Sequence, residues 1–151
     1  MRRTLLAILC LLQPATTSAQ TTGDPDAGER GFTRCRACHS VTAADGTVIV
    51  RGGATGPNLF GIIGRPAGTG EGYRYSQAFR DLAASGFVWS EADLASFVAD
   101  PPTFLQQRLG DPAATTGMGF RLRSGGEDIA AWLALQGTSR SVSQRTKDQT
   151  P

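Results

Sequence analysis

The sequence predicts an all-α domain of about five short helices joined by long loops. Helix-starting signals recur along the chain and are followed by apolar residues at helical spacing. No segment alternates polar and apolar residues over the length of a normal strand, and only Thr47 to Val50 suits a small hairpin arm. The 19 glycines and 8 prolines predict a large share of loop. A chain of 151 residues without an internal repeat favours one domain.

The first 19 residues have the organisation of a cleaved export signal. Arg2 and Arg3 form a positive start, residues 5–12 are apolar, and Thr17-Ser18-Ala19 offers a cleavage site. The apolar run is too short to span a bilayer. A buried N-terminal helix is the alternative, but Pro14 and the polar residues after it argue against one. We therefore expect an exported periplasmic protein with no membrane span.

The charge of the chain is close to balanced. It has 15 basic and 13 acidic side chains, which excludes a polybasic nucleic-acid binder. Cleavage after Ala19 would remove two arginines and no acid, leaving 13 side chains of each sign. A partner guided by charge must therefore recognise a local patch.

The first predicted helix begins at a capping signature and ends at a cysteine pair. Asp26 followed by Glu29 favours a helix start, and Phe32, Cys35 and Cys38 continue the pattern to about residue 38. Residues 40–74 are rich in glycine and lack a sustained helical period, so we expect a loop there.

Three short helices are predicted in the middle of the chain. One starts near Ser76, and a second has Ser90 as N-cap with Trp89 and Leu94 as a hydrophobic staple. Asp100-Pro101-Pro102 should stop the second helix, and a brief helical turn over residues 103–108 should end at Gly110.

The last predicted helix closes the domain. Ser124 and Glu127 repeat the capping box, and an apolar stripe formed by Ile129, Trp132 and Leu133 precedes Gly137. The sequence thus predicts a domain over residues 20–137. Residues 138–151 are polar and are expected to form a disordered tail.

One motif carries the chemistry, Cys35-Arg36-Ala37-Cys38-His39. This C-x-x-C-H pattern is typical of c-type haem attachment, because two thiols and an imidazole share one helical face at this spacing. A disulfide, a thioredoxin-like redox pair and a zinc half-site are the alternatives. The disulfide would be strained, the βαβ context of thioredoxin is missing, and zinc lacks further ligands. The motif therefore predicts one covalently attached haem c, with His39 as an axial iron ligand.

The second axial ligand follows by elimination. His39 is the only histidine, and Met118 is the only methionine after Met1. Met118 lies between glycines, which allow the backbone to approach a flat ring. A core gap-filler is the ordinary role of a methionine, and Lys147 and the new N-terminal amine are weaker ligand candidates. Two filled axial positions favour electron transfer over oxygen or peroxide chemistry.

Taken together, these motifs resemble a class I cytochrome c, specifically the large bacterial cytochrome c2 type. The resemblance spans residues 26–136 and is carried by the C-x-x-C-H motif, Gly56-Pro57-Asn58-Leu59, Trp89-Ser90, and Met118 with Phe120. The long segments before Pro57 and before Met118 favour the c2 subgroup over the small mitochondrial members. The resemblance implies a haem wrapped by helices, with the first and last helices crossing through Gly28, Phe32 and Trp132.

The resemblance also implies roles around the haem. The Pro57 carbonyl would accept a hydrogen bond from the ring of His39. Arg65, Tyr75 and Trp89 would bind a haem propionate. Trp89 as a staple only, and Arg65 as a solvated surface charge, are the alternatives.

The resemblance further implies an electron carrier and not an enzyme. Family members dock with lysines around the haem edge, and here Arg34, Arg36, Arg121 and Arg123 would provide the positive charge. We expect a soluble monomer that docks transiently on membrane redox complexes. A cytochrome bc-type quinol-oxidising complex is the expected donor, and a terminal oxidase or a photosynthetic reaction centre the expected acceptor. The alternatives are an electron acceptor for a dedicated periplasmic dehydrogenase, a peroxidase-like protein and a gas-binding protein.

Overall fold

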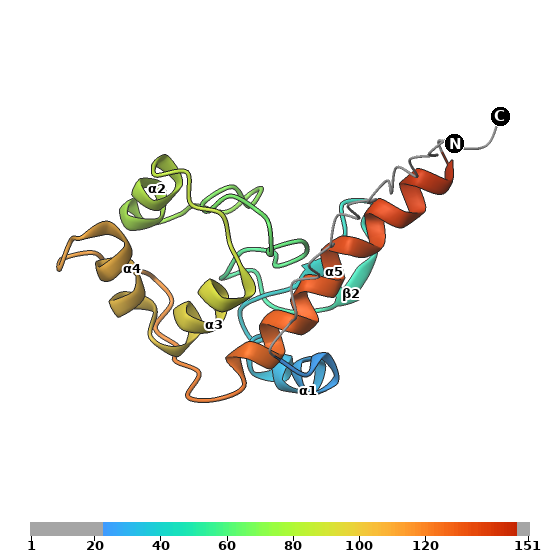
Figure 1. Cartoon of the computed structure of the whole chain (residues 1–151), viewed down its shortest axis with the longest axis horizontal. Helices are drawn as coiled ribbons and strands as arrows, with labels where there is room; N and C mark the ends of the chain where they lie inside the picture. The colour runs from blue at the N-terminus through green and yellow to red at the C-terminus, as the bar shows by residue number, and fades with distance from the viewer. Residues whose placement is uncertain (1–22, 148–151) are drawn as a thin grey trace, which may run out of the picture.

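Helices and long loops make up nearly all of the fold. The computed structural model describes residues 23–147, and the side chains of residues 23–137; the predicted signal peptide lies outside this range. The helices are α1 Pro25–Gly31, α2 Gln77–Ala84, α3 Glu91–Ala99, α4 Pro101–Leu109 and α5 Gly126–Lys147 (Figure 1). A 3-10 turn covers Phe32–Arg34, and a hairpin pairs β1 Val41–Thr42 with β2 Val48–Val50. The predicted all-α class and the hairpin arm are confirmed.

α1 begins two residues earlier than the capping signature predicts. The Asp24 carboxylate accepts hydrogen bonds from the amides of Asp26 (2.9 Å) and Ala27 (3.3 Å), and Pro25 occupies the first turn. Asp24 is therefore the N-cap, and the prediction for Asp26 is wrong. A proline is favoured just after the N-cap because its missing N–H has no helical partner in any case.

The segment after α1 tightens where a continuous α-helix is predicted. α1 ends at Gly31, and the Cys35 amide donates to the Phe32 carbonyl at 2.8 Å. The His39 amide then donates to the Cys35 carbonyl at 3.0 Å. The predicted single helix to residue 38 is thus wrong in detail, but a chain of tight turns still carries the cysteine motif away from α1.

α1 and α5 cross at very close range (Figure 1). A Cβ on Gly28 would lie 2.0 Å from the Asp128 carbonyl oxygen, so only glycine allows this approach. The rings of Phe32 and Trp132 pack with centroids 4.8 Å apart, and both side chains are buried. The predicted crossing through these three residues is confirmed.

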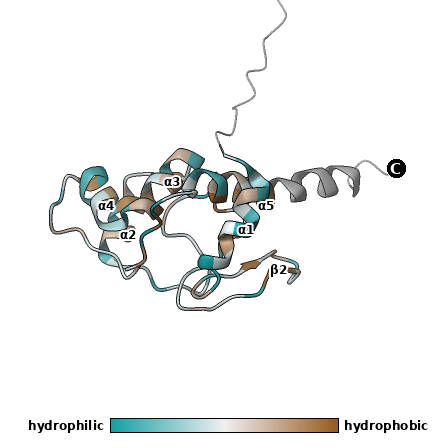
Figure 2. Ribbon diagram, turned by 90° about the horizontal axis from the view of Figure 1, so that it is seen from below, coloured by the Kyte–Doolittle hydropathy of each residue, from teal (hydrophilic) through white to brown (hydrophobic). Residues whose placement is uncertain are grey.

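α2, α3 and α4 form the other side of the core. Ser90 caps α3 by accepting the Asp93 amide at 3.1 Å. Asp100 ends α3 and directly caps α4, which starts at Pro101 and not at residue 103 as predicted. Gly110, with φ of 64°, ends α4 as predicted. Figure 2 shows hydrophobic and hydrophilic segments alternating along these helices. Their buried residues include Phe97 of α3 and Phe104 of α4, and aromatic contacts join these two rings to each other and Phe97 to Phe79 of α2.

α5 does not end at Gly137. The helix continues to Lys147, and a Cβ on Gly137 would lie 3.0 Å from the Cα of Gly61. The glycine therefore permits a close contact with a loop in mid-helix, and the predicted helix end there is wrong. The structure has helix over residues 138–147, where a disordered tail is expected, and residues 148–151 lie outside the described range. Among the helices of residues 23–147, none has the length and apolar character needed to cross a membrane.

Candidate haem site

The turns after α1 present both cysteines of the motif as free thiols. Cys35 is half-buried and Cys38 is exposed. Burial raises the pKa of the Cys35 thiol, and the neighbouring Arg34 guanidinium offsets only part of this effect. No disulfide joins Cys35 and Cys38, so the disulfide alternative does not agree with the structure. Within the described residues, no group of three His, Cys, Asp or Glu side chains could hold a metal ion, which disfavours the zinc alternative.

A hydrogen bond to a backbone oxygen orients the ring of His39. Its Nδ1 lies 2.8 Å from the Pro57 carbonyl oxygen, so Nδ1 carries the proton and donates it. Burial lowers the pKa of His39, and the hydrogen bond to Pro57 acts in the opposite direction. The neutral imidazole is therefore favoured, with Nε2 left free as a ligand atom.

Glycines let the following loop lie directly against this motif. A Cβ on Gly56 would be 2.3 Å from Cε1 of His39, and a Cβ on Gly52 would be 1.9 Å from the His39 carbonyl oxygen. The amides of Gly53 and Gly56 donate to the carbonyls of Arg36 (3.0 Å) and Cys38 (2.9 Å). These close contacts were not predicted, although the glycine-rich composition of residues 40–74 was a signal in the sequence that could have indicated them.

Met118 reaches the site from the loop between α4 and α5. Its side chain is half-buried, and its amide donates to the Thr116 hydroxyl at 3.2 Å. His39, Met118, Cys35 and Cys38 all line one cavity of about 310 Å³. The structure thus brings together all four residues that the sequence predicted as thioether and axial positions.

The rest of this cavity is mostly apolar. Its walls include Leu59, Ile62, Phe79, Leu94, Phe97, Ile129 and Leu133. A c-type haem needs two thiols, axial nitrogen and sulfur atoms, and a dry hydrophobic shell around the ring. The residues present fit that group.

Arg65 is the most informative polar residue of the cavity. Its guanidinium donates to the carbonyls of Asn58 (3.0 Å) and Phe60 (3.3 Å), and burial lowers its pKa while the nearby Tyr75 raises it. None of the ion pairs found among the described side chains involves Arg65. A half-buried cation without a protein carboxylate suits an anionic ligand group. The alternative of a solvated surface charge does not agree with this burial.

Tyr75 and Trp89 both line the haem cavity. The Tyr75 hydroxyl accepts the Gly70 amide at 3.1 Å, and Trp89 is buried with only 4% of its surface exposed. Because both line the cavity, Trp89 is more than a helix staple. Tyr73, which packs edge-on against Tyr75 at 4.8 Å, also lines the cavity and was missed by the sequence analysis.

Asn58 supports the loop that holds His39. Its Oδ1 accepts the amides of Thr42 (3.0 Å) and Phe60 (3.1 Å), and its Nδ2 donates to the Thr42 carbonyl at 2.7 Å. The side chain therefore ties the Pro57 segment to the hairpin. Asn58 belongs to the Gly56-Pro57-Asn58-Leu59 motif, but its role was not predicted from the sequence.

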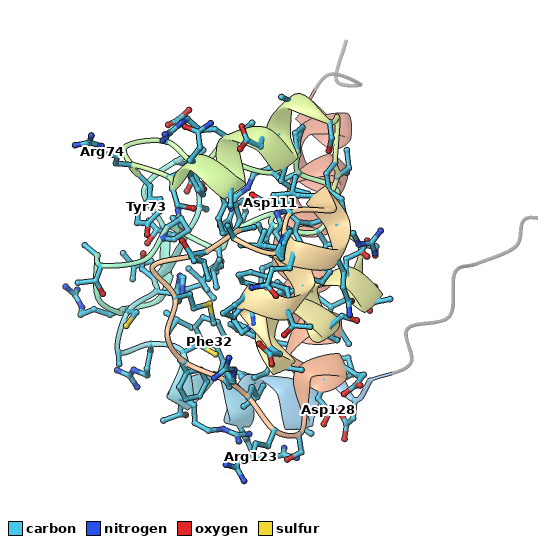
Figure 3. All side chains as sticks on the ribbon, turned by 90° about the vertical axis from the view of Figure 1, so that its left-hand side faces the viewer. Phe32, Tyr73, Arg74, Asp111, Arg123 and Asp128 are labelled. Carbon is cyan, nitrogen blue, oxygen red and sulfur yellow. The ribbon has the colours of Figure 1, made fainter. Side chains whose placement is uncertain are left out.

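The four arginines predicted for docking do not share one environment. Arg34, Arg36 and Arg123 are exposed, and Figure 3 shows Arg123 pointing outward from the loop before α5. Arg121 is also exposed, but its Nε lies 3.1 Å from Oδ1 of Asp100. Its charge is therefore partly compensated within the chain.

Known proteins resemble the chain over most of its length. No protein-family model matches the chain. It is 49% identical to cytochrome c2 of Rhodobacter capsulatus over 129 residues, which is 85% of this chain and 90% of that protein. It is 43% identical to cytochrome c-550 of Paracoccus versutus over 136 residues, which is 89% of this chain and 88% of that protein.

Solved structures agree with the sequence comparison. The structure of cytochrome c2 from Rhodobacter capsulatus matches with a TM-score of 0.73 and 52% identity, covering 74% of this chain and 97% of that chain. Cytochrome c2 from Paracoccus denitrificans matches with a TM-score of 0.75 and 39% identity, covering 78% and 98%. The chain therefore belongs to the class I cytochromes c of the bacterial cytochrome c2 type, an electron-carrier family, and carries one covalently bound haem c.

Proposed function

We propose that this protein is a soluble periplasmic electron carrier between membrane redox complexes. Its donor is a cytochrome bc-type quinol-oxidising complex, and its acceptor is a terminal oxidase or a photosynthetic reaction centre. The observation that carries the proposal is the meeting of the only histidine, the only methionine after Met1 and the two cysteines of the motif at one apolar cavity.

In this proposal, four side chains hold the haem. Cys35 and Cys38 would form the two thioether bonds, and His39 Nε2 and Met118 Sδ would ligate the iron. When bound, the haem supplies reversible one-electron chemistry between ferrous and ferric iron.

The remaining cavity residues set the conditions for that chemistry. The Pro57 carbonyl fixes the plane and tautomer of the His39 ring through the 2.8 Å hydrogen bond. Arg65, Tyr75 and Trp89 bind a propionate, with Arg65 supplying the compensating charge. The apolar walls exclude water from the iron and favour a raised reduction potential.

Docking uses the exposed arginines beside the motif and the Met118 loop. Arg34, Arg36 and Arg123 attract an acidic partner surface, and guanidinium groups bind carboxylates in a forked geometry. We infer a small and hydrated contact of a monomer, which dissociates quickly after transfer.

Other roles make different demands on the iron. A peroxidase-like or gas-binding protein needs a vacant or easily displaced sixth position. An electron acceptor for a dedicated periplasmic dehydrogenase would use the same haem site. This alternative therefore differs from the proposal only in the electron donor.

Spectroscopy and an acceptor assay test the proposal. Holoprotein from a host that matures c-type cytochromes should show, when oxidised, the far-red charge-transfer band of thioether-ligated iron. The reduced protein should be oxidised by membranes containing a terminal oxidase or reaction centre, and the oxidised protein reduced by a quinol with bc-complex membranes. A high-spin spectrum would contradict ligation of the iron by Met118. Reduction only by a dehydrogenase would contradict the bc-type complex as electron donor.

A further inference from the structure

We propose that the ion pair between Asp100 and Arg121 is a latch that keeps the Met118 loop closed. Arg121 is then a positioning residue for the sixth iron ligand, and not primarily a docking charge. The inference rests on the proposed function through the ligation of iron by Met118.

The loop of residues 110–125 is fastened to the body on the side that precedes Met118. The Ala114 carbonyl accepts a hydrogen bond from Gln106 Nε2 at 3.4 Å, and the Thr115 carbonyl accepts one from Ser76 Oγ at 3.3 Å. Ala114 is also buried. This arm therefore has contacts with both α4 and α2.

The arm that follows Met118 is fastened at two neighbouring positions. The Leu122 amide donates to the Val98 carbonyl at 2.8 Å, and the Leu122 side chain is buried. Arg121 Nε reaches Asp100 Oδ1 at 3.1 Å. Both partners belong to the end of α3, so this arm is held against one short stretch of chain.

Little else holds the segment between Met118 and Arg121. Gly117 and Gly119 line the haem cavity, and a Cβ at either position would have no protein atom within 4 Å. Phe120 is 45% exposed. The Met118 side chain packs against the hydrophobic core, and the anchors at the two arms hold the rest of the loop.

Asp100 is well suited to act as an anchor because its carboxylate is already oriented. It ends α3 and caps α4, where the same Oδ1 accepts the Thr103 amide at 3.4 Å. Fixing two long side chains in one geometry usually cancels most of the gain from an exposed ion pair. Here only Arg121 must be ordered, so more of that gain remains.

The chain offers two matched controls. Arg108 pairs with Asp93 between α4 and α3, and neither residue belongs to the loop of residues 110–125, so Arg108→Gln breaks a second surface ion pair outside the Met118 arms. The variant also removes the contact of Arg108 with the rings of Phe87 and Phe104. Arg123 lies two residues after Arg121 and is exposed, so Arg123→Gln makes the same charge change on the same segment.

The test measures how readily imidazole displaces the methionine from ferric holoprotein. Arg121→Gln and Asp100→Asn should each raise the apparent imidazole affinity about two- to fivefold at low salt, the range expected for an exposed ion pair. Asparagine is a good N-cap, so Asp100→Asn removes the charge and keeps the cap of α4. The double variant should bind imidazole no more tightly than either single variant, because both remove one interaction. In 1 M salt the wild-type affinity should approach that of the variants, because exposed charges are screened there.

The outcomes separate the latch from the proposed ligand. If Arg121→Gln binds imidazole as the wild type does, or if Arg108→Gln or Arg123→Gln raises the affinity equally, the latch is wrong while Met118 ligation stands. If the wild type lacks the far-red thioether band, Met118 ligation fails and the latch fails with it.

Discussion

α5, which crosses α1, and the loop that carries Met118 both line the haem cavity but are held by different contacts. At the crossing, backbone lies against backbone at Gly28, and the buried rings of Phe32 and Trp132 pack beside it. In the loop, hydrogen bonds and one exposed ion pair hold the two arms, and the centre lines the haem cavity. The crossing can yield only by unpacking the core, whereas the loop can open by losing a few polar contacts. The contrast indicates a rigid histidine side and a methionine side that can detach locally.

The largest expected effect comes from filling the crossing. Gly28→Ala should lower the free energy of unfolding by about 3 kcal/mol, because the new Cβ meets backbone that only moves if the helices separate. Gly31→Ala is the control on the same helix, since its Cβ would make ordinary contacts at 3.5 Å and its φ of −65° suits alanine. The control should change stability by less than about 1 kcal/mol. Equal losses in denaturant titrations of the two variants would show that the crossing is not specially tight.

Removing the thioether affects the loop side most strongly. Met118→Ala should abolish the far-red band, admit carbon monoxide to the reduced haem, and lower the reduction potential by on the order of 0.1 V, within the roughly 0.8 V that axial ligands span. Redox titration and carbon monoxide difference spectra measure these changes. An unchanged potential would remove Met118 from its proposed position.

Charge reversal beside the cavity should have an intermediate effect. Arg36→Glu and Arg123→Glu should each slow electron transfer with a membrane partner several-fold at low salt, since steering by surface charge is lost. The rates should converge with the wild type near 1 M salt, where the screening length is about 3 Å. Arg30→Glu makes the same charge change at an exposed arginine of α1, a helix that contributes no residue to the cavity lining, and should slow transfer less. Rates that ignore ionic strength would refute arginine docking.

The smallest expected effect is a pH dependence of the Asp100 contact. Desolvation raises the pKa of Asp100, but hydrogen bonds from Thr103 and Arg121 and the charge of Arg121 together lower it by more. A carboxyl group with a lowered pKa in the folded state stabilises that state above its ordinary pKa, and the contribution is lost as the pH falls through the lowered value. The wild type should therefore be slightly more stable than Asp100→Asn near neutral pH, and the difference should shrink in acid. If denaturant titrations show that the stability difference between the wild type and Asp100→Asn grows as the pH falls, the Asp100 carboxylate does not stabilise the fold in this way.

Local signals in the sequence were sufficient for much of the fold and of the site. The Ser90 cap, the Gly110 helix end and the C-x-x-C-H turn depend on neighbours within a few residues, and each was predicted where it occurs. Met118 was found because the sequence has no other methionine after Met1. Elimination of this kind needs no geometry.

The misses involve contacts between distant residues. Gly137 resembles a helix end in sequence, yet it serves the contact with Gly61, 76 positions earlier. Arg121 resembles the other exposed arginines, and only the fold brings it to Asp100. The choice of Asp24 over Asp26 as cap depends on tertiary contact as well, because the Asp24 amide donates to the Asp128 side chain at 2.8 Å. Such pairings cannot be read from spacing along one segment.

The contact between Gly61 and Gly137 has a consequence for the permitted length of α5. The helix meets Gly28 at Asp128 and meets Gly61 nine residues later, so two glycine contacts fix its axial register at separate points. Inserting one residue between them would advance the second point by about 1.5 Å and rotate it by about 100°. A bulkier side chain would then face Gly61. The two contacts therefore fix the number of residues between them. This part of α5 should tolerate substitutions more readily than insertions or deletions.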